Sequence, residues 1–141
     1  MSEIRRASAD DIPAMAAVVN AWIDGTPWMP RTHSEDEIKG FIRDAFPVRD
    51  MWVTGDPVDG YMSLDVETAK IGALYLMRTG AGIGRAMVDI AKEGRDFVWL
   101  STHKPNVAAQ RFYAREGFVP VAEIRAEPPE TVSEIRMEWR R

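Results

Sequence analysis

The chain has 141 residues, 45% of them hydrophobic, which suits one compact domain that buries roughly 70% of its unfolded surface. A formal net charge of -4 and a pI of about 5.2 argue against a nucleic-acid partner, because nucleic-acid-binding proteins neutralise phosphates with clustered Lys and Arg. With no cysteine and two histidines, the composition excludes disulfides and a cysteine acyl-enzyme and disfavours a metal site. No apolar run approaches the roughly 18 residues of a membrane span, and no signal-peptide core opens the chain. We therefore expect a soluble cytoplasmic protein with no membrane partner.

Two helices are predicted before the main sheet. A short strand over 4–8 leads into a helix that begins with a capping pattern at Ser8 and ends near Ile23. The glycine and prolines of 25–30 interrupt the chain. A second capping pattern then starts an amphipathic helix over 34–46.

The middle of the chain changes to the two-residue period of strands. Segment 51–54, a turn rich in Gly, Asp and Pro, and segment 61–66 predict a hairpin. Segment 71–77 is nearly all apolar, so we expect a central, buried strand there.

The last third of the chain predicts two helices and three strands. These are a helix over 83–91, a strand over 97–100, a helix over 107–116, a strand over 118–124 and a strand over 134–140. Because one helix joins strand 71–77 to strand 97–100, these two strands are expected to pair in parallel. Pro120 requires its strand to lie at an edge or to contain a bulge.

Three alternating glycines follow the apolar strand, as Gly80-x-Gly82-x-Gly84. Without a Cβ, such residues let backbone N–H groups converge, and the helix that starts there adds the positive end of its dipole. The run therefore predicts a phosphate or pyrophosphate site. Its spacing and its position deep in the chain disfavour the G-x-G-x-x-G dinucleotide fingerprint, and the P-loop pattern is not present in the sequence.

A second motif, Asn106-x-x-Ala109-x-x-Phe112-Tyr113, follows the glycine run further along the chain. Together with the order of elements, the two motifs resemble those of the GCN5-related N-acetyltransferases (GNATs) over nearly the whole chain. The resemblance implies an α+β fold, with a GNAT-like mixed β-sheet, a central splayed strand and about four flanking helices. It also implies a single acyltransferase domain over residues 1–141.

The resemblance further implies acetyl-CoA as cofactor and roles for the matching positions only. Backbone groups of Leu74, Tyr75 and Leu76 would pair with the pantetheine arm and polarise the thioester carbonyl. Asn106 would hydrogen-bond the cofactor, and Tyr113 would protonate the departing thiolate, which suits a phenol that is protonated at pH 7. The implied cofactor-binding set is Leu74, Tyr75, Leu76, Arg78, Thr79, Gly80, Ala81, Gly82, Ile83, Gly84, Arg85 and Asn106.

The chain departs from the family pattern in the loop and in the catalytic base. Thr79 stands where the family usually has Gln or Arg, and Arg78 lies one place early, so Arg78 either reaches the phosphates or coats the surface. The strand over 70–74 lacks the carboxylate that many relatives use as a general base. Asp65 and His33 are the candidates for that role, each with a solvated surface position as the alternative. Direct attack by an amine that loses its proton to water would need neither.

Large side chains gather in the loop after the first helix, at Trp28, Met29 and Arg31. They either pack on the core or line the acceptor pocket, where an aromatic face could receive an amine cation and Arg31 a carboxylate or the cofactor. His103 and Lys104 end a buried strand, where open parallel sheets place ligands, with a solvated loop as the alternative for Lys104. The other tryptophans are expected in the core: Trp22, Trp52, Trp99 and Trp139.

The predicted function is transfer of an acetyl group from acetyl-CoA to a primary amine by direct attack in a ternary complex. The acceptor is expected to be a small-molecule amine or a peptide amine, and a homodimer is compatible with the sequence. The alternative is a catalytically silent acyl-CoA-binding or regulatory module that kept the fold but lost its base.

Overall fold

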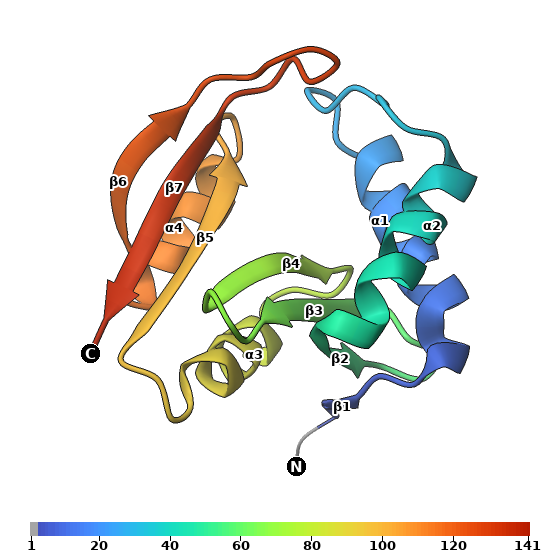
Figure 1. Ribbon diagram of the computed structural model, residues 1–141, viewed down its shortest axis with the longest axis horizontal. Coiled ribbons are helices and arrows are strands. Elements are labelled where there is room, and N and C mark those ends of the chain that lie inside the picture. Colours follow the sequence, from blue (N-terminus) through green and yellow to red (C-terminus); the bar gives the residue numbers. More distant parts are fainter. Residues whose placement is uncertain (1–2) are drawn as a thin grey trace.

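The computed structural model describes residues 3–141. Its strands form one seven-stranded sheet in the order β1-β2-β3-β4-β5-β7-β6. The elements are β1 (Arg5–Arg6), η1 (Ala9–Asp11), α1 (Ile12–Asp24), α2 (Glu35–Ala45), η2 (Phe46–Val48), β2 (Asp50–Thr54), β3 (Gly60–Asp65), β4 (Lys70–Leu76), α3 (Ile83–Lys92), β5 (Phe97–His103), α4 (Val107–Arg115), β6 (Val119–Ile124) and β7 (Glu134–Arg140). Figure 1 shows β5, β6 and β7 angled away from β2, β3 and β4. The predicted α+β class and the mixed sheet with four α-helices are confirmed.

The two capping patterns lie at helix starts: Ser8 precedes the 3-10 turn η1, which continues into α1 at Ile12, and Ser34 precedes α2. The Asp11 carboxylate accepts the Ser8 backbone N–H at 2.8 Å and holds the Arg5 guanidinium at 2.8 Å, which fixes the entry to α1. At α2, the Ser34 hydroxyl accepts the Glu37 N–H at 3.1 Å, and the Glu37 carboxylate accepts the Ser34 N–H at 2.9 Å. Within residues 3–141, no helix is long and apolar enough to cross a membrane.

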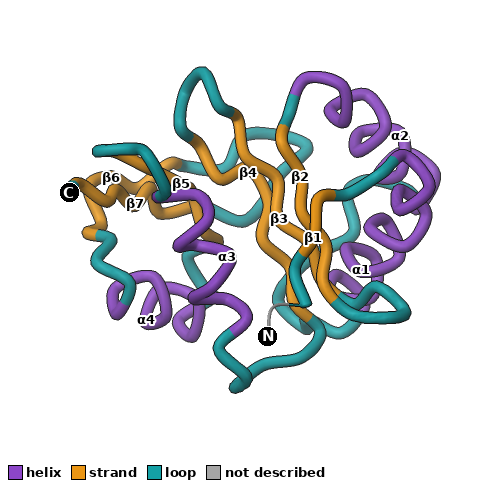
Figure 2. The backbone as a smooth tube through the Cα atoms, turned by 90° about the horizontal axis from the view of Figure 1, so that it is seen from below, coloured by secondary structure: helices purple, strands orange, loops and turns teal. Residues whose placement is uncertain are grey.

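Two hydrophobic cores lie on opposite faces of the sheet. One face packs against α1 and α2, and the other packs against α3 and α4, so the two pairs of helices lie on different sides of the molecule (Figure 2). The α1–α2 core contains Ile12, Met15, Ala16, Val19, Ile38, Ile42, Met51, Val53 and Tyr61. The α3–α4 core contains Met62, Leu64, Ile71, Ile83, Met87, Val88, Ala91, Val98, Leu100, Tyr113, Phe118 and Met137.

The parallel strands β4 and β5 pair over a very short distance. Their register joins Lys70 to Trp99 and Ile71 to Leu100. Beyond these pairs the strands diverge. On its other side, β4 carries a bulge at Gly72, because Ile71 opposes Leu64 while Ala73 opposes Ser63. A bulge bends its strand and increases its twist, which accounts for the divergence at this point.

The predicted parallel pairing and central position of strand 71–77 are confirmed, but its predicted burial holds only for Ile71. Ile71 is 3% exposed, while Ala73 to Leu76 are only half-buried. Leu74 and Leu76 pack at the margin of the α3–α4 core, and Ala73 and Tyr75 pack at the margin of the α1–α2 core. Trp99 is also placed differently from the prediction: it lies outside both cores, its Nε1–H donates to the Thr68 carbonyl at 3.0 Å, and the Arg136 guanidinium lies 3.8 Å from its ring centroid.

The C-terminal strands confirm the expectation for Pro120. Its strand β6 is the edge of the sheet, and the register with β7 shifts between Pro120 and Ala122. A proline at this position removes no ladder hydrogen bond from the sheet interior.

Candidate functional site

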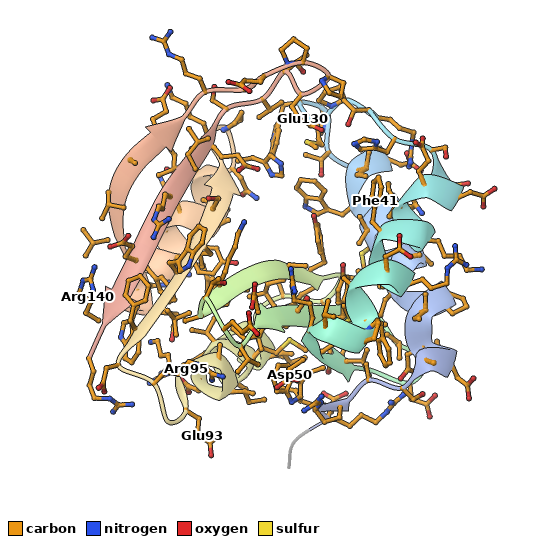
Figure 3. All side chains as sticks on the ribbon, in the orientation of Figure 1. Phe41, Asp50, Glu93, Arg95, Glu130 and Arg140 are labelled. Carbon is orange, nitrogen blue, oxygen red and sulfur yellow. The ribbon has the colours of Figure 1, made fainter. Side chains whose placement is uncertain are left out.

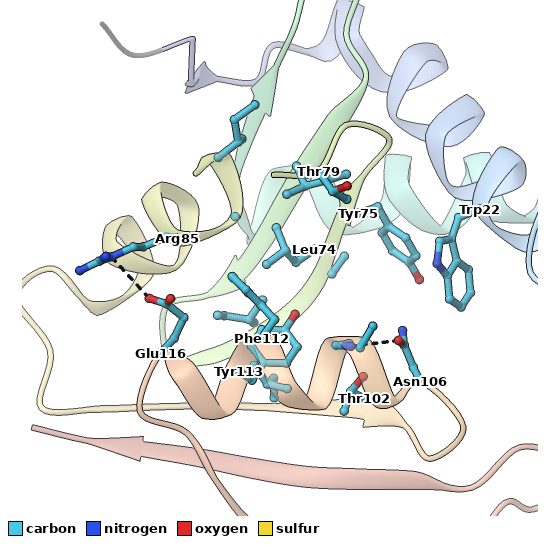
Figure 4. Close-up of a pocket in the computed structure, with 18 of the residues that line it drawn as sticks. Trp22, Leu74, Tyr75, Thr79, Arg85, Thr102, Asn106, Phe112, Tyr113 and Glu116 are labelled. Carbon is cyan, nitrogen blue, oxygen red and sulfur yellow. Dashed lines mark hydrogen bonds and ion pairs between the residues drawn. The ribbon is translucent and has the colours of Figure 1, made fainter. Parts of the chain in front are cut away.

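A cavity of about 690 Å³ fills the gap between β4 and β5. This volume is in the range of small-molecule sites. Its wall is formed by β4, the glycine loop that follows it, the end of β5 and one side of α4 (Figure 4). The site therefore exists because the two central strands separate.

Within residues 3–141, the backbone of β4 beyond Ile71 has no strand partner on the edge that faces the cavity. Met77 N–H donates to Asp59 O at 2.9 Å, and antiparallel hydrogen bonds recur every second residue. Tyr75 and Ala73 therefore bond to β3. Leu74 and Leu76 direct their N–H and C=O groups the other way, into the gap. A ligand in the cavity can pair with these groups as a strand would.

The glycine loop presents further donors at the start of α3. Gly80 and Gly82 have φ values of 81° and 76°, in the left-handed region that other residues adopt only at a cost. The first helical hydrogen bond of α3 runs from Ala86 N–H to Gly82 O. The N–H groups of 83–85 precede it, and no partner accepts them within residues 3–141. Together with the helix dipole, they form an anion site.

Gly84 serves a different purpose from the two glycines before it. A Cβ at this position would lie 3.0 Å from the Phe112 ring and 3.4 Å from Leu76. Any larger residue would require the Phe112 ring to shift, so glycine suits the close approach of α3 to α4 and β4. The third glycine of the motif thus closes the wall of the cavity.

The two arginines of the loop lie in different surroundings. Arg78 pairs with Asp59 and Glu3, the latter at 3.2 Å, so its guanidinium is already neutralised. Arg85 is 75% exposed, and its Nε lies 3.9 Å from the Glu116 carboxylate (Figure 4). Of the two, Arg85 is the cation at the start of α3 that has the freedom to meet an anion.

Asn106, at the start of α4, and Tyr113, within α4, both line the cavity. The Asn106 side-chain oxygen accepts the Ala109 N–H at 3.1 Å and so caps α4, which leaves its amide NH2 as a donor. Tyr113 is 8% exposed, and its hydroxyl points across the cavity toward β4 and Leu74 (Figure 4). Burial, and to a smaller extent Tyr75, raise the pKa of Tyr113 above its usual value, so the phenol stays protonated.

An aromatic cluster stands at the end of the cavity away from the glycine loop. Trp22 makes an edge contact with Tyr75 at a centroid distance of 5.4 Å and stacks on His103 at 5.5 Å. Trp28 lies 5.7 Å from Trp22 and 5.6 Å from His103. These four residues span from β4 to β5 across the opening, and we refer to them as the aromatic cluster.

The sequence misplaced one member of this cluster and indicated the position of another without giving it a role. Trp22 was expected in the core because it continues the apolar stripe of α1, but it lines the cavity. His103 lies at the carboxyl end of a parallel strand, a position where ligands bind in open sheets. The sequence had pointed to this position, and the structure places His103 at the first cavity.

A second cavity, of about 330 Å³, lies on the α1–α2 face of β4. It includes Met29 and His33, and it shares Gly72, Ala73 and Tyr75 with the first cavity. The bulged part of β4 is thus a common wall between the two spaces.

The mouth of the second cavity brings two distant loops together. His33 Nε2 lies 3.5 Å from the Glu130 carboxylate, and the His33 ring makes an edge contact with Phe41. Figure 3 shows Glu130 on the loop between β6 and β7, beside the loop that joins α1 to α2.

Arg31 and Asp65 form hydrogen bonds away from the first cavity. Arg31 donates to Asn20 Oδ1 and Asp24 Oδ1, both at 2.9 Å, and to the His33 carbonyl at 3.1 Å, so it braces the loop between α1 and α2. Asp65 ends β3 and accepts the backbone N–H groups of the turn that follows.

The electrostatics of Asp65 do not suit a base. Desolvation raises its pKa, but the hydrogen bonds from Thr68 and Glu67, together with Arg49, outweigh this effect and lower the pKa overall. The structure places neither Asp65 nor His33 at the first cavity.

Comparison with known proteins places this geometry in a known fold. No family model and no curated protein matches the chain. Solved structures match nearly its whole length. A GCN5-related N-acetyltransferase from Rhodopseudomonas palustris has a TM-score of 0.77 at 16% identity, covering 98% of this chain and 94% of that one.

Two further solved structures extend the comparison. YncA of Salmonella typhimurium, solved with its cofactor acetyl-CoA, has a TM-score of 0.70 at 20% identity and covers 97% of this chain and 92% of its own. A variant of the spermidine N-acetyltransferase SpeG from Vibrio cholerae has a TM-score of 0.69 at 16% identity, with coverages of 97% and 94%. The chain has the fold of the GCN5-related N-acetyltransferases, as the sequence motifs predicted.

Proposed function

We propose that the protein transfers an acetyl group from acetyl-CoA to a primary amine by direct attack, with both reactants bound together. The observation that carries this proposal is the gap between β4 and β5. It has an anion site at one end, unpaired strand amides along one wall and a buried phenol opposite them. The likeness in fold to YncA, solved with acetyl-CoA, supports the choice of cofactor.

The residues present fit acetyl-CoA. The N–H groups at the start of α3 and the exposed Arg85 suit a pyrophosphate. A Cβ would crowd Phe112 at Gly84, whereas the space over Gly80 and Gly82 is open for a ligand. Further along the gap, the free backbone groups of β4 suit the amides of a pantetheine arm. When bound, acetyl-CoA supplies an activated acetyl thioester.

The chain's own groups would then assist the transfer. An N–H on the free edge of β4, from Leu74 or Leu76, donates to the thioester oxygen and stabilises the negative charge that develops there. Such a fixed donor needs no reorganisation at the moment of reaction. Asn106, held as the cap of α4, donates its amide to the bound cofactor.

Tyr113 is positioned to deliver a proton to the departing sulfur. Its phenol is buried, protonated and directed at the wall formed by β4. Because a phenol with a raised pKa is a weaker acid than a thiol, we place the transfer at the moment when the C–S bond breaks. The acceptor nitrogen, which becomes acidic as it is acylated, returns a proton to the phenolate.

The acceptor amine is proposed to approach from the α1–α2 face of β4. Trp28 belongs to the aromatic cluster, and Met29 lines the second cavity, so both border this approach. Aromatic faces and the nearby carboxylate of Glu130 favour a cationic amine. The name of SpeG, which shares the fold, records spermidine as an acceptor of that protein.

The alternative is an acyl-CoA-binding module without activity. One observation favours it: neither Asp65 nor His33, the bases predicted from the sequence, reaches the first cavity.

Two measurements separate these functions. Isothermal titration with coenzyme A is expected to give a dissociation constant in the micromolar range, and no binding at millimolar concentration would overturn both proposals. Release of the free thiol is then followed with acetyl-CoA and a panel of n-butylamine, benzylamine, spermidine and glycinamide. Release that depends on an amine establishes the transferase, and binding without release from any amine favours the module.

A further inference from the structure

His103 lies beside the first cavity and has no part in the acetyl transfer described above. It is the last residue of β5, half-buried, and enclosed by the aromatic cluster. Both tryptophans of the cluster contact its ring, while the ring itself lines the first cavity. A histidine held in this way has a defined orientation beside the space that receives the ligand.

The direction of the strands brings His103 across the gap from β4. Ile71 pairs with Leu100, and beyond this pair the two strands run in the same direction on either side of the gap, where Trp22 contacts both Tyr75 of β4 and His103 of β5. Burial alternates along β5: Leu100 and Thr102 are buried, whereas Ser101 and His103 are half-buried. His103 therefore extends from the face of the sheet that carries α1 and α2, which is the side from which we propose the acceptor approaches.

Few groups on the cavity wall can accept a proton near neutral pH. The titratable residues that line it are Tyr75, Arg78, Arg85, His103, Tyr113, Arg115 and Glu116. Only an imidazole and a carboxylate among them are bases at pH 7. Glu116 lies past the far end of α4, where it pairs with Arg85 at the glycine loop. His103, before the start of α4, is the base on the acceptor side.

The groups around His103 define its charge. Glu134 of β7 places its carboxylate 3.9 Å from Nε2, and Glu130 of the β6–β7 loop acts from further away. Burial lowers the pKa of His103 and outweighs these two carboxylates, which raise it. On the β4 side the nearest titratable group, Tyr75, is neutral, because burial raises its pKa. The neighbouring Lys104 is paired with Glu123 at 3.0 Å.

The two ring nitrogens have different surroundings. Nε2 faces Glu134, whereas Nδ1 makes no hydrogen bond within residues 3–141. A carboxylate near one nitrogen favours the proton on that nitrogen and leaves the other with its lone pair. Nδ1 is thus the basic atom, and Glu134 can stabilise the imidazolium that forms when it takes a proton.

We propose that His103 is the general base that removes a proton from the acceptor ammonium, an inference that rests on the proposed acetyl transfer. The ammonium N–H bond breaks, and the proton passes to Nδ1. The freed lone pair forms the new C–N bond as the C–S bond breaks. The sulfur takes the Tyr113 proton, the acylated nitrogen returns one to Tyr113, and His103 releases its proton to solvent. One proton is released for each amide formed.

The first test observes the imidazole directly, without turnover. Because the chain has two histidines, the His33→Gln variant leaves His103 as the only ring in a ¹H–¹⁵N histidine spectrum. Titrating this variant with and without coenzyme A should give a midpoint below the usual value of about 6.5, and bound coenzyme A should shift the ring signals. A midpoint at or above 6.5, or ring signals that do not respond to coenzyme A, would overturn the assignment.

The second test is the pH profile of kcat/KM with whichever amine of the panel releases thiol fastest. His103→Gln should lower kcat/KM by about 100-fold at pH 7.5 and abolish the acid limb, while the dissociation constant of coenzyme A changes less than twofold. Lys104→Gln, at the adjacent exposed position, is the matched control and should keep the wild-type profile. An unchanged acid limb in a folded His103→Gln protein would overturn the proposal.

The outcomes distinguish this inference from the proposed function. If the wild-type protein acetylates an amine and His103→Gln retains its profile, the transferase stands and His103 is not its base. If the wild-type protein releases no thiol with any amine, the proposed function fails, and the role assigned to His103 fails with it.

Discussion

The two ends of the central cavity are built from different parts of the polypeptide. At the glycine loop, the wall is backbone: amides of β4, left-handed glycines and the first turn of α3. At the aromatic cluster, the wall is side chains that come from α1, the following loop, β4 and β5. A backbone site depends on main-chain conformation and suits a ligand common to many proteins of one fold. A side-chain site changes with every substitution and suits a ligand that differs between them.

The largest effect is expected from a change at Tyr113, the proposed proton donor, which lies between the two ends of the central cavity. Tyr113→Phe removes the proton donor but keeps the ring that packs against Phe112 and Phe118. Turnover should fall by about 100-fold, a typical value for loss of general acid catalysis, with little change in coenzyme A affinity. Steady-state kinetics and isothermal titration check the two parts, and an unchanged turnover would remove Tyr113 from the proton path if chemistry limits the rate.

The backbone end is tested at a left-handed glycine. Gly82→Ala adds no clash, since its Cβ would meet nothing within 4 Å, but it strains a residue with φ of 76°. We expect coenzyme A affinity to fall about tenfold, or ~1.4 kcal/mol, as the loop amides shift. Gly94→Ala is the matched control, because Gly94 has φ of 72° and the same open space but lies at the far end of α3. Equal losses of affinity in both variants would contradict a local role for the loop.

A smaller effect is expected from a change at Asp11. This residue lies at the start of α1, the helix that carries Trp22. The Arg5 hydrogen bond, against opposing desolvation, lowers the pKa of Asp11 to about 2, with help from the Ser8 N–H. A carboxylate with a lowered folded-state pKa stabilises the protein above its unfolded value of 3.8 and loses that contribution as the pH falls through about 2. Asp11→Asn should therefore lower the free energy of unfolding by about 1 kcal/mol at pH 7, after allowance for solvent around the exposed Arg5.

Urea unfolding between pH 7 and pH 3 checks this prediction. The difference between wild type and Asp11→Asn should shrink at the acid end, and a difference independent of pH would argue against the ion pair as its source. Coenzyme A affinity should not change, because Asp11 lies outside both ends of the cavity.

The smallest effect distinguishes the two loop arginines. Arg85→Ala should weaken coenzyme A binding about threefold at low salt, as expected for one exposed ion pair. Arg78→Ala should change it less than twofold, because Asp59 and Glu3 already neutralise Arg78. The difference should disappear in about 0.5 M salt through screening, and a larger effect at Arg78 would reverse the two roles.

The contrast between the two ends also explains what could be predicted from the sequence. The elements and the glycine loop follow from local signals, such as the Ser34 capping box, the period of two in β7 and the glycine spacing. These signals act within a few residues, so the sequence displays them directly. The parallel pairing of β4 and β5 and the edge position of Pro120 follow from connection rules of the same kind.

The side-chain end could not be predicted in the same way. Trp22 continues the apolar stripe of α1, and only the divergence of β4 from β5 decides that it faces a cavity. Arg31 could have reached a ligand, but the path of the loop brings it to Asn20 and Asp24 instead. The His33 and Glu130 side chains lie close together although the two residues are far apart in the sequence. These outcomes depend on how the two halves of the sheet are placed, which no local pattern records.

The short pairing of β4 with β5 has a mechanical consequence. Two residue pairs join β4 to β5. Strands β1 to β4 and strands β5 to β7 therefore form two parts of the sheet, here called leaves, with a short connection between them. A ligand that pairs with the free amides of Leu74 and Leu76 while it touches α4 would hold both leaves at once. We therefore expect bound coenzyme A to slow amide hydrogen exchange in β5 and α4 as well as in β4, because contacts with each would connect the two parts of the sheet.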